Sequence, residues 1–196
     1  MFNVKCLMYR IVLASNSPRR RELLGGLGIP FEVKVLPNIS ESYPDTLPAD
    51  EIAEYIAREK GDVYKSRIDE DILVITADTV VICDDEVLGK PTDAADARRM
   101  LHLLSGRTHH VVTGVCLTTT FRQRSFSVRT EVTFKHLSDE EISYYVENYK
   151  PFDKAGAYGI QEWIGYIGVT GINGSYFNVM GLPVQRIYEE LKQNFS

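Results

Sequence analysis

Two periodicities of hydrophobic and polar residues alternate along this chain. Short β-branched runs, which predict strands, occupy residues 10–13, 31–36, 72–88, 109–120 and 125–137. Apolar residues at helical spacing predict helices over residues 48–67, 92–106, 138–149 and 183–195, in addition to a short helix that follows Ser17. Because strand–helix units and consecutive strands both occur, the pattern predicts an α/β fold with a mixed sheet.

Turn and cap residues agree with these predicted strands and helices. The Asp-Asp-Glu sequence at 84–86 predicts a hairpin within the run at 72–88, and residues 121–124 predict a second hairpin. Gly106 is placed to end a helix, and Ser138 and Glu141 have the spacing of a capping box. Residues 171–183 contain three glycines and an Asn-Gly pair, which predicts a tight turn near a ligand or a neighbouring backbone.

The composition is that of an ordinary globular protein, with 44% hydrophobic and 25% charged residues in a chain of 196. We therefore expect a single domain over residues 1–196. The three cysteines, Cys6, Cys83 and Cys116, fit neither a disulfide framework nor a paired metal site, so we expect reduced thiols and a cytoplasmic protein. No signal peptide and no apolar run of roughly 20 residues is visible, so we expect no membrane association.

The formal net charge of −5 argues against a nucleic-acid-binding protein, because such proteins usually carry a basic face. An anionic small molecule is compatible with this charge if cations gather locally, often with a divalent metal. Three consecutive arginines, Arg19 to Arg21, supply such cations.

These arginines open the first predicted helix. Ser17 stands at the N-cap position and Pro18 at the first helical position. Arginines in a first turn oppose the helix dipole, which favours acids there, so an anionic ligand would explain them. A strand, a loop and a helix N-terminus with converging N–H and guanidinium groups are typical of a phosphate site. The alternative is a capped helix with surface arginines.

Asp78 is an acid within an otherwise apolar strand, where burial is costly unless the carboxylate is paired or bound to a cation. Lys90 closes the return strand of the same predicted hairpin, so we expect the two side chains on neighbouring strands. The pair suggests metal-assisted hydrolysis, with a plain ion pair as an equally weighted alternative. Glu41 lies in a polar loop, where acids are usually only solvated, but with Asp78 it would make a carboxylate pair for Mg²⁺.

Several other polar and aromatic residues favour structural roles. His109 and His110 are adjacent in a predicted strand and therefore point to opposite faces, which makes them a poor metal pair. Tyr144, Tyr145 and Tyr149 favour helix packing over a platform for base stacking.

Six motifs, in their order and spacing, resemble those of the Maf family of nucleoside-triphosphate pyrophosphatases. They are SNSPRRRELL, TADTVV, GKP, LSGRTHHVVTGV, DKAGAYGIQ and GSYFNVMGLP, and the resemblance runs from about Arg10 to the C-terminus. It implies a fold similar to that of the inosine-triphosphate pyrophosphatases: an elongated α/β domain with a curved mixed sheet flanked by helices and a central cleft, often in a homodimer. Members of the family hydrolyse a nucleotide between its α and β phosphates, giving a monophosphate and pyrophosphate with a divalent metal.

The resemblance also implies roles for individual residues. Ser17 and Arg20 match positions that bind phosphate. Glu41 and Asp78 match acidic positions linked to the metal, with Asp78 as the proton acceptor, and Lys90 matches the lysine of the cleft.

A second set of residues bears on the choice of base. Arg19, Thr79 and Gln161 match the branch that acts on dTTP and UTP, as opposed to the branch that prefers methylated guanine nucleotides. The chain departs from the family pattern at Thr76, where a glycine is common, and in the nine or so residues that precede the usual start.

We therefore expect a pyrophosphatase that acts on dTTP and UTP, with modified pyrimidine nucleotides as further candidate substrates, and that uses Mg²⁺ or Mn²⁺. Water is the expected nucleophile, and Ser17 is the less favoured alternative because it caps the helix. One alternative is a nucleotide-binding regulator of cell division or septum formation in which hydrolysis is incidental. A phosphatase releasing orthophosphate is less favoured, since no P-loop sequence or acyl-phosphate motif is visible.

Overall fold

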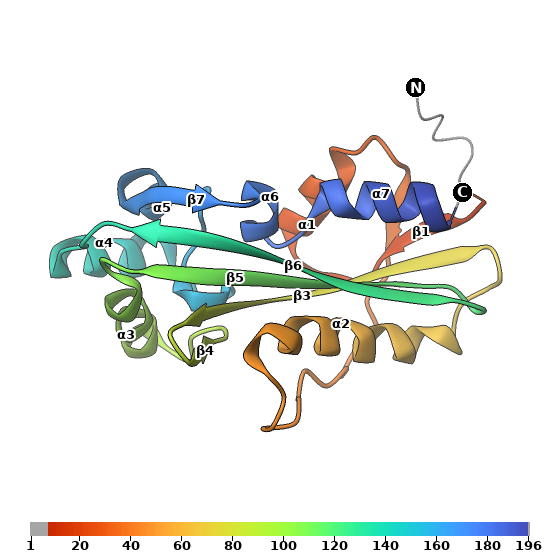
Figure 1. Cartoon of the computed structure of the whole chain (residues 1–196), viewed down its shortest axis with the longest axis horizontal. Helices are drawn as coiled ribbons and strands as arrows, with labels where there is room; N and C mark the ends of the chain where they lie inside the picture. The colour runs from red at the N-terminus through yellow and green to blue at the C-terminus, as the bar shows by residue number, and fades with distance from the viewer. Residues whose placement is uncertain (1–7, 196) are drawn as a thin grey trace. The chain divides into compact units, whose positions relative to one another are not determined.

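The computed structural model describes residues 8–195 (Figure 1). The chain forms two compact units: unit 1 comprises residues up to Asp78, residues 113–128 and residues from Gly181 onward, and unit 2 comprises residues 79–112 and 129–180. A single domain over residues 1–196 stays a prediction. Within the described part of the chain, no helix is both long and apolar enough to cross a membrane.

Seven strands within residues 8–195 form one mixed sheet in the order β2-β1-β3-β5-β6-β7, with β4 paired to β3. The strands are β1 (Arg10–Leu13), β2 (Phe31–Val33), β3 (Ile72–Cys83), β4 (Glu86–Leu88), β5 (Thr108–Thr118), β6 (Gln123–Phe134) and β7 (Val169–Asn173). Strand β1 is parallel to β2 and β3, whereas β4 on β3 and β7 on β6 are antiparallel. This confirms the predicted α/β class and the mixed sheet.

Helices connect and cover these strands. They are α1 (Pro18–Gly25), α2 (Ala49–Lys65), α3 (Ala94–Leu104), α4 (Asp139–Tyr149), α5 (Trp163–Gly168), α6 (Tyr176–Val179) and α7 (Val184–Asn194), with a 3₁₀ turn, η2, at Ala155–Ala157. The predicted capping box of Ser138 and Glu141 is present at α4, and Gly106 follows α3 with a φ of 71°. The hydrophobic pattern of the sequence does not predict α5, β7 or α6.

The second strand is shorter than the pattern predicts. We expected a strand over 31–36, but β2 ends at Val33. The reason is Tyr64 of α2, whose hydroxyl donates to the carbonyl of Lys34 at 3.0 Å and accepts from the N–H of Leu36 at 2.8 Å. A buried side chain, and not a neighbouring strand, satisfies the backbone there.

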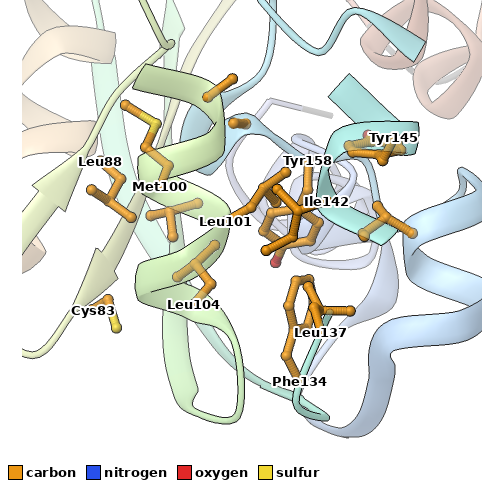
Figure 2. Packing of buried hydrophobic residues seen from close by; sticks show 14 of the residues in the cluster. Cys83, Leu88, Met100, Leu101, Leu104, Phe134, Leu137, Ile142, Tyr145 and Tyr158 are labelled. Atoms are coloured by element: carbon orange, nitrogen blue, oxygen red, sulfur yellow. The ribbon is translucent and has the colours of Figure 1, made fainter. Parts of the chain in front are cut away.

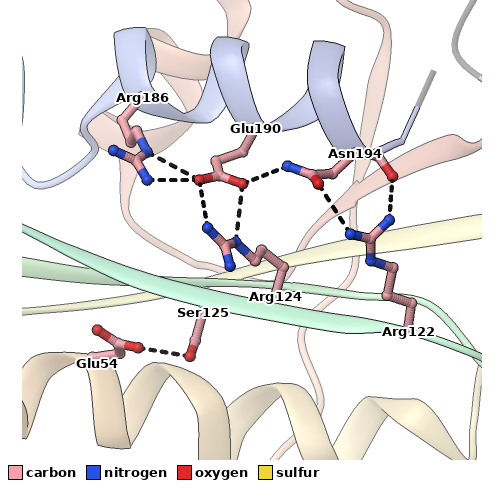
Figure 3. A network of polar contacts seen from close by, with 7 residues as sticks. All are labelled: Glu54, Arg122, Arg124, Ser125, Arg186, Glu190 and Asn194. Carbon is pink, nitrogen blue, oxygen red and sulfur yellow. Dashed lines mark hydrogen bonds and ion pairs between the residues drawn. The ribbon is translucent and has the colours of Figure 1, made fainter.

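In unit 1, helices α2 and α7 cover opposite faces of β6 (Figure 3). Adjacent residues of a strand point to opposite faces. Arg124 accordingly reaches Glu190 of α7 at 3.1 Å, while the hydroxyl of Ser125 donates to Glu54 of α2 at 2.7 Å. The helices of this unit are therefore fastened to the sheet by polar contacts as well as by apolar packing.

Helix α2 approaches the sheet very closely. A Cβ atom on Gly114 of β5 would lie 2.2 Å from the carbonyl carbon of Ala53, and one on Gly61 would lie 2.6 Å from the hydroxyl of Thr118. Glycine at both positions lets the helix backbone reach the strand. This close contact sets the distance between α2 and the sheet.

Unit 2 has its own apolar core (Figure 2). Leu101 and Leu104 of α3 pack with Phe134 of β6 and Ile142 of α4, and all four are buried. The two described cysteines, Cys83 and Cys116, are buried free thiols, as expected, whereas Cys6 lies outside the described residues.

Glu190 is a buried carboxylate on which three side chains of unit 1 converge. Arg124, Arg186 and Asn194 all donate to it (Figure 3). Burial by itself would raise the pKa of Glu190, but the hydrogen bonds from Arg124 and Arg186 outweigh burial and hold this pKa below its usual value. The carboxylate therefore stabilises the fold above the pKa of an unfolded glutamate, about 4.3, and this contribution is lost as the pH falls through the lower folded value.

We expect Glu190→Gln to lower the free energy of unfolding at pH 7 by roughly 1–3 kcal/mol, because two arginines lose a charged acceptor. Urea unfolding measures this loss, and the exposed neighbour Glu189 offers the control Glu189→Gln, which we expect to change little. Repeating the titration at pH 4 and below should shrink the difference between wild type and variant. A difference that stays constant with pH would contradict the role of the charge.

Candidate functional site

The first helix begins as the sequence predicts. Ser17 is its N-cap, and the hydroxyl of Ser17 accepts a hydrogen bond from the backbone N–H of Arg20 at 3.4 Å. Pro18 occupies the first turn, which contains no acid. Arg21 is exposed, whereas Arg19 and Arg20 are partly buried. The positive end of α1 thus carries two partly buried arginines.

Arg20 is held firmly against the backbone of unit 1. Its Nε donates to the carbonyl of Gly181 at 2.8 Å, and its Nη1 donates to the carbonyl of Ala77 at 2.9 Å. Burial lowers the pKa of Arg20, and the negative charges of Asp78 and Glu41 partly offset this effect. The guanidinium stays positive at any physiological pH. Arg20 therefore ties the start of α1 to the residue that precedes Asp78.

Asp78 and Glu41 share one cation. The ammonium of Lys60 lies 2.9 Å from Oδ1 of Asp78 and 2.7 Å from Oε1 of Glu41. The side chains of Lys60 and Asp78 are only 13% and 15% exposed, whereas that of Glu41 is half exposed. The two predicted carboxylates are thus brought together, within reach of a single side chain.

Lys60 is a residue of this cluster that the sequence pattern does not predict. It lies in the Arg-Glu-Lys segment of α2, where charged residues read as a solvated helix face. Thr76, which stands where the family commonly has a glycine, helps to position Lys60. The Thr76 hydroxyl is buried and donates to the carbonyl of Ala57 at 2.6 Å. That bond joins β3, the strand that carries Asp78, to α2 at a point one turn before Lys60.

The charges of this cluster favour an anion. Lys60 contacts both carboxylates, and the charges of Asp78, Glu41 and Arg19 all act on Arg20. Within residues 8–195, no group of three or more His, Cys, Asp or Glu side chains is arranged to hold a metal ion by itself. A metal at the carboxylate pair would need further oxygen ligands from a substrate or from water.

The remaining predicted site residues belong to unit 2. Thr79 follows Asp78 directly and is partly buried. The expectation that Lys90 closes the return strand is wrong, because β4 ends at Leu88 and Lys90 lies in the exposed loop beyond it. The ladder of β3 and β4 ends at the pair Val81 and Leu88, beyond which the chain turns toward α3.

Gln161 lies in a turn between η2 and α5. Its side-chain oxygen Oε1 is buried and has no hydrogen-bond partner among the described residues. A buried polar atom without a partner is costly, and such an atom often marks a ligand position. The amide oxygen of Gln161 is therefore an acceptor that the described residues leave unsatisfied.

The histidine pair is structural, as expected. His109 is fully buried, and its Nε2 lies 2.8 Å from the hydroxyl of Tyr158. Burial lowers the pKa of His109 to about 3, so the ring is neutral at physiological pH. His110 is on the other face and contacts Glu131.

Comparison with known proteins agrees with the motif order. Residues 10–194 match the family described as Maf-like protein. The chain belongs to this family. Three Maf-like relatives named dTTP/UTP pyrophosphatase are 67% identical over 185 residues in Phocaeicola vulgatus, 57% over 186 residues in Porphyromonas gingivalis and 46% over 191 residues in Flavobacterium johnsoniae. These alignments cover 94–97% of this chain and 94–98% of the relatives.

Among solved structures, a HAM1 protein from Coxiella burnetii is similar to this Maf-like chain, with a TM-score of 0.47 and 17% sequence identity. The similarity covers 95% of this chain and all of the other.

Proposed function

We propose that this chain hydrolyses dTTP and UTP to the nucleoside monophosphate and pyrophosphate. The observation that carries the proposal is the pair of carboxylates, Glu41 and Asp78, held around one cationic position by Lys60. The arginines at the start of α1 add the positive charge that a triphosphate requires. The names of the relatives support the same reaction and the same two substrates.

The carboxylate pair fits a divalent cation. The Lys60 ammonium contacts an oxygen of each carboxylate, as a small cation between them would. Mg²⁺ is commonly held by one or two carboxylates together with water and substrate phosphates, and Mn²⁺ accepts similar oxygen ligands. Glu41 and Asp78 would hold the metal, which when bound would polarise the phosphate and neutralise its charge.

In this proposal, each site residue has a separate role in the hydrolysis. Asp78 accepts the proton of the attacking water, since it is the carboxylate set in the rigid strand. Ser17 and Arg20 bind phosphate oxygens at the start of α1. Lys90 stabilises negative charge on the pyrophosphate leaving group. Water is the nucleophile, because His109 is neutral and buried, and burial raises the pKa of the Cys116 thiol to about 11.

A panel of nucleotides tests the reaction. Purified protein is incubated with dTTP, UTP, CTP and GTP and with Mg²⁺ or Mn²⁺, and pyrophosphate and orthophosphate are measured separately. We expect pyrophosphate as the product, with dTTP and UTP preferred. Orthophosphate as the first product would indicate a phosphatase, and tight binding with negligible turnover would favour the regulator of cell division.

Recognition of the base is assigned to Gln161, with Arg19 and Thr79. The amide of Gln161 accepts from N3–H and donates to O4 of uracil or thymine, whereas cytosine presents the reverse pattern and a purine is too large. We expect Gln161→Glu to lower kcat/KM for UTP at least 10-fold relative to CTP, because a carboxylate cannot donate to O4. Unchanged ratios in the variant would remove Gln161 from base recognition and leave the triphosphate chemistry intact.

The proposed location of the protein is the cytoplasm, and its proposed assembly is a homodimer. The buried free thiols of Cys83 and Cys116 suit a reducing cytoplasm. The mass of the native protein in solution tests the homodimer, which should have twice the mass of one chain.

A further inference from the structure

Glu162, the residue after Gln161, is a clamped carboxylate in unit 2. The hydroxyl of Tyr145 donates to its Oε2, and the ammonium of Lys154 lies 3.1 Å from its Oε1. Lys154 is only 9% exposed and also contacts Asp153 at 2.7 Å. Both oxygens of Glu162 are therefore fixed by partners that are themselves buried in the fold.

The clamp extends to the backbone of the turn. Besides donating to Glu162, the Tyr145 hydroxyl accepts a hydrogen bond from the N–H of Gly159 at 3.0 Å. Burial, followed by the hydrogen bond to Glu162, raises the pKa of Tyr145 far above its usual value, so its proton is retained for that bond. Tyr145 is fully buried in the core of unit 2 and is a rigid support (Figure 2).

The amino end of the Gln161 amide and the carboxylate of Glu162 both lie next to Gly159. A Cβ placed on Gly159 would be 3.1 Å from Nε2 of Gln161 and also 3.1 Å from Oε2 of Glu162. The amino group of Gln161 and the carboxylate of Glu162 are thus on the same side of Gly159. The amide oxygen is the buried atom without a hydrogen-bond partner among the described residues.

The orientation of the amide decides which base a glutamine can read. A side-chain amide has a donor and an acceptor of nearly the same shape, and rotation by half a turn exchanges them. One orientation pairs with the N3–H and O4 of uracil or thymine. The reversed orientation pairs equally well with the N3 and amino group of cytosine. A freely rotating glutamine therefore cannot distinguish UTP from CTP, and something must hold it.

We propose that Glu162, clamped by Tyr145 and Lys154, orients the amide of Gln161 and so makes this position select uracil and thymine against cytosine. The negative charge attracts the amino group of the amide and repels its oxygen, which disfavours the reversed orientation. Glu162 and Tyr145 are positioning residues that act through Gln161. The inference rests on the proposed role of Gln161 in reading the base.

The test compares UTP with CTP, which differ only at the edge that Gln161 would contact. Glu162→Gln keeps the size of the side chain and its capacity to accept from Tyr145, but removes the charge. We expect the UTP to CTP ratio of kcat/KM to fall about 5- to 10-fold, chiefly through a higher KM for UTP. Tyr145→Phe, which releases both Glu162 and the Gly159 N–H, should lower the ratio in the same direction.

Two matched variants control for general effects. Tyr149 stacks on Tyr145 in the same helix with ring centroids 5.1 Å apart, and Glu147 of that helix pairs with Arg98 at 3.0 Å. Tyr149→Phe and Glu147→Gln should leave the UTP to CTP ratio unchanged. A fall in the ratio as large as in Glu162→Gln would show that any perturbation of α4 has this effect, and would overturn the inference.

The decisive measurement repeats Glu162→Gln in a Gln161→Ala background. If Glu162 acts through Gln161, the second substitution should not lower the ratio further, because coupled residues are not additive. An equal further fall would overturn the inference and leave Gln161 as the base-reading residue. If Gln161→Ala alone leaves the ratio unchanged, the base-reading role itself is wrong, and this inference falls with it.

Discussion

Asp78→Asn is expected to reduce turnover of dTTP and UTP by about 10²- to 10⁴-fold while the protein stays folded. The substitution keeps the shape of the side chain but removes its capacity to accept a proton. It also removes one of the two negative charges that contact the Lys60 ammonium. The loss should appear in kcat more than in KM, because a general base acts in the transition state.

The same substitution at an acid outside the site provides the control for Asp78. Asp71 stands just before the start of β3, is exposed, and pairs with Arg10 at 2.7 Å. Asp71→Asn should change kcat less than about twofold, since exposed ion pairs contribute little. A near-normal kcat in folded Asp78→Asn would exclude Asp78 as the proton acceptor.

Arg20→Ala is expected to lower kcat/KM for both substrates by about 10- to 100-fold, through the loss of a charged hydrogen-bonding group. The bonds of Arg20 to the carbonyls of Gly181 and Ala77 would be lost as well, so the melting temperature should also fall. Arg20→Lys keeps the charge but not the planar fork, and should recover only part of the activity.

A substitution of the exposed neighbour Arg21 tests whether Arg20 has a specific role or only adds to the positive charge of α1. Arg21→Ala removes one positive charge from the same helix, and we expect it to change kcat/KM only slightly. If Arg21→Ala were as damaging as Arg20→Ala, the division of roles within the three arginines would be wrong.

The start of α1 could be predicted from the sequence because its determinants are local. A serine cap, a proline in the first turn and the preceding apolar strand all lie within a few residues of one another. The hairpins and the capping box of α4 were predictable for the same reason. The pairing of Glu41 with Asp78 came from the preference of Mg²⁺ for carboxylates, and the family resemblance supported it, because no local pattern joins two residues so far apart in the chain.

Lys60 and Glu190 could not be predicted because their partners are distant in the chain. Lys60 is 18 residues from Asp78, and Glu190 is 66 residues from Arg124. Charged residues in a helix ordinarily indicate a solvated face, and only the packing of α2 and α7 against the sheet removes most of these two side chains from solvent. The segment from α5 to α6 escaped prediction because its glycines break the period of the apolar residues.

The separation of the hydrolytic residues from the 145–162 segment has an evolutionary consequence. On the roles proposed above, the residues for hydrolysis, Asp78 and Arg20 of unit 1 and Lys90 of unit 2, lie outside the part of unit 2 that carries Gln161 and Glu162. After gene duplication, one copy can therefore drift toward another base through substitutions in the 145–162 segment, while selection holds the hydrolytic residues fixed. Paralogues that share the first set and differ in the second would be the record of such a history.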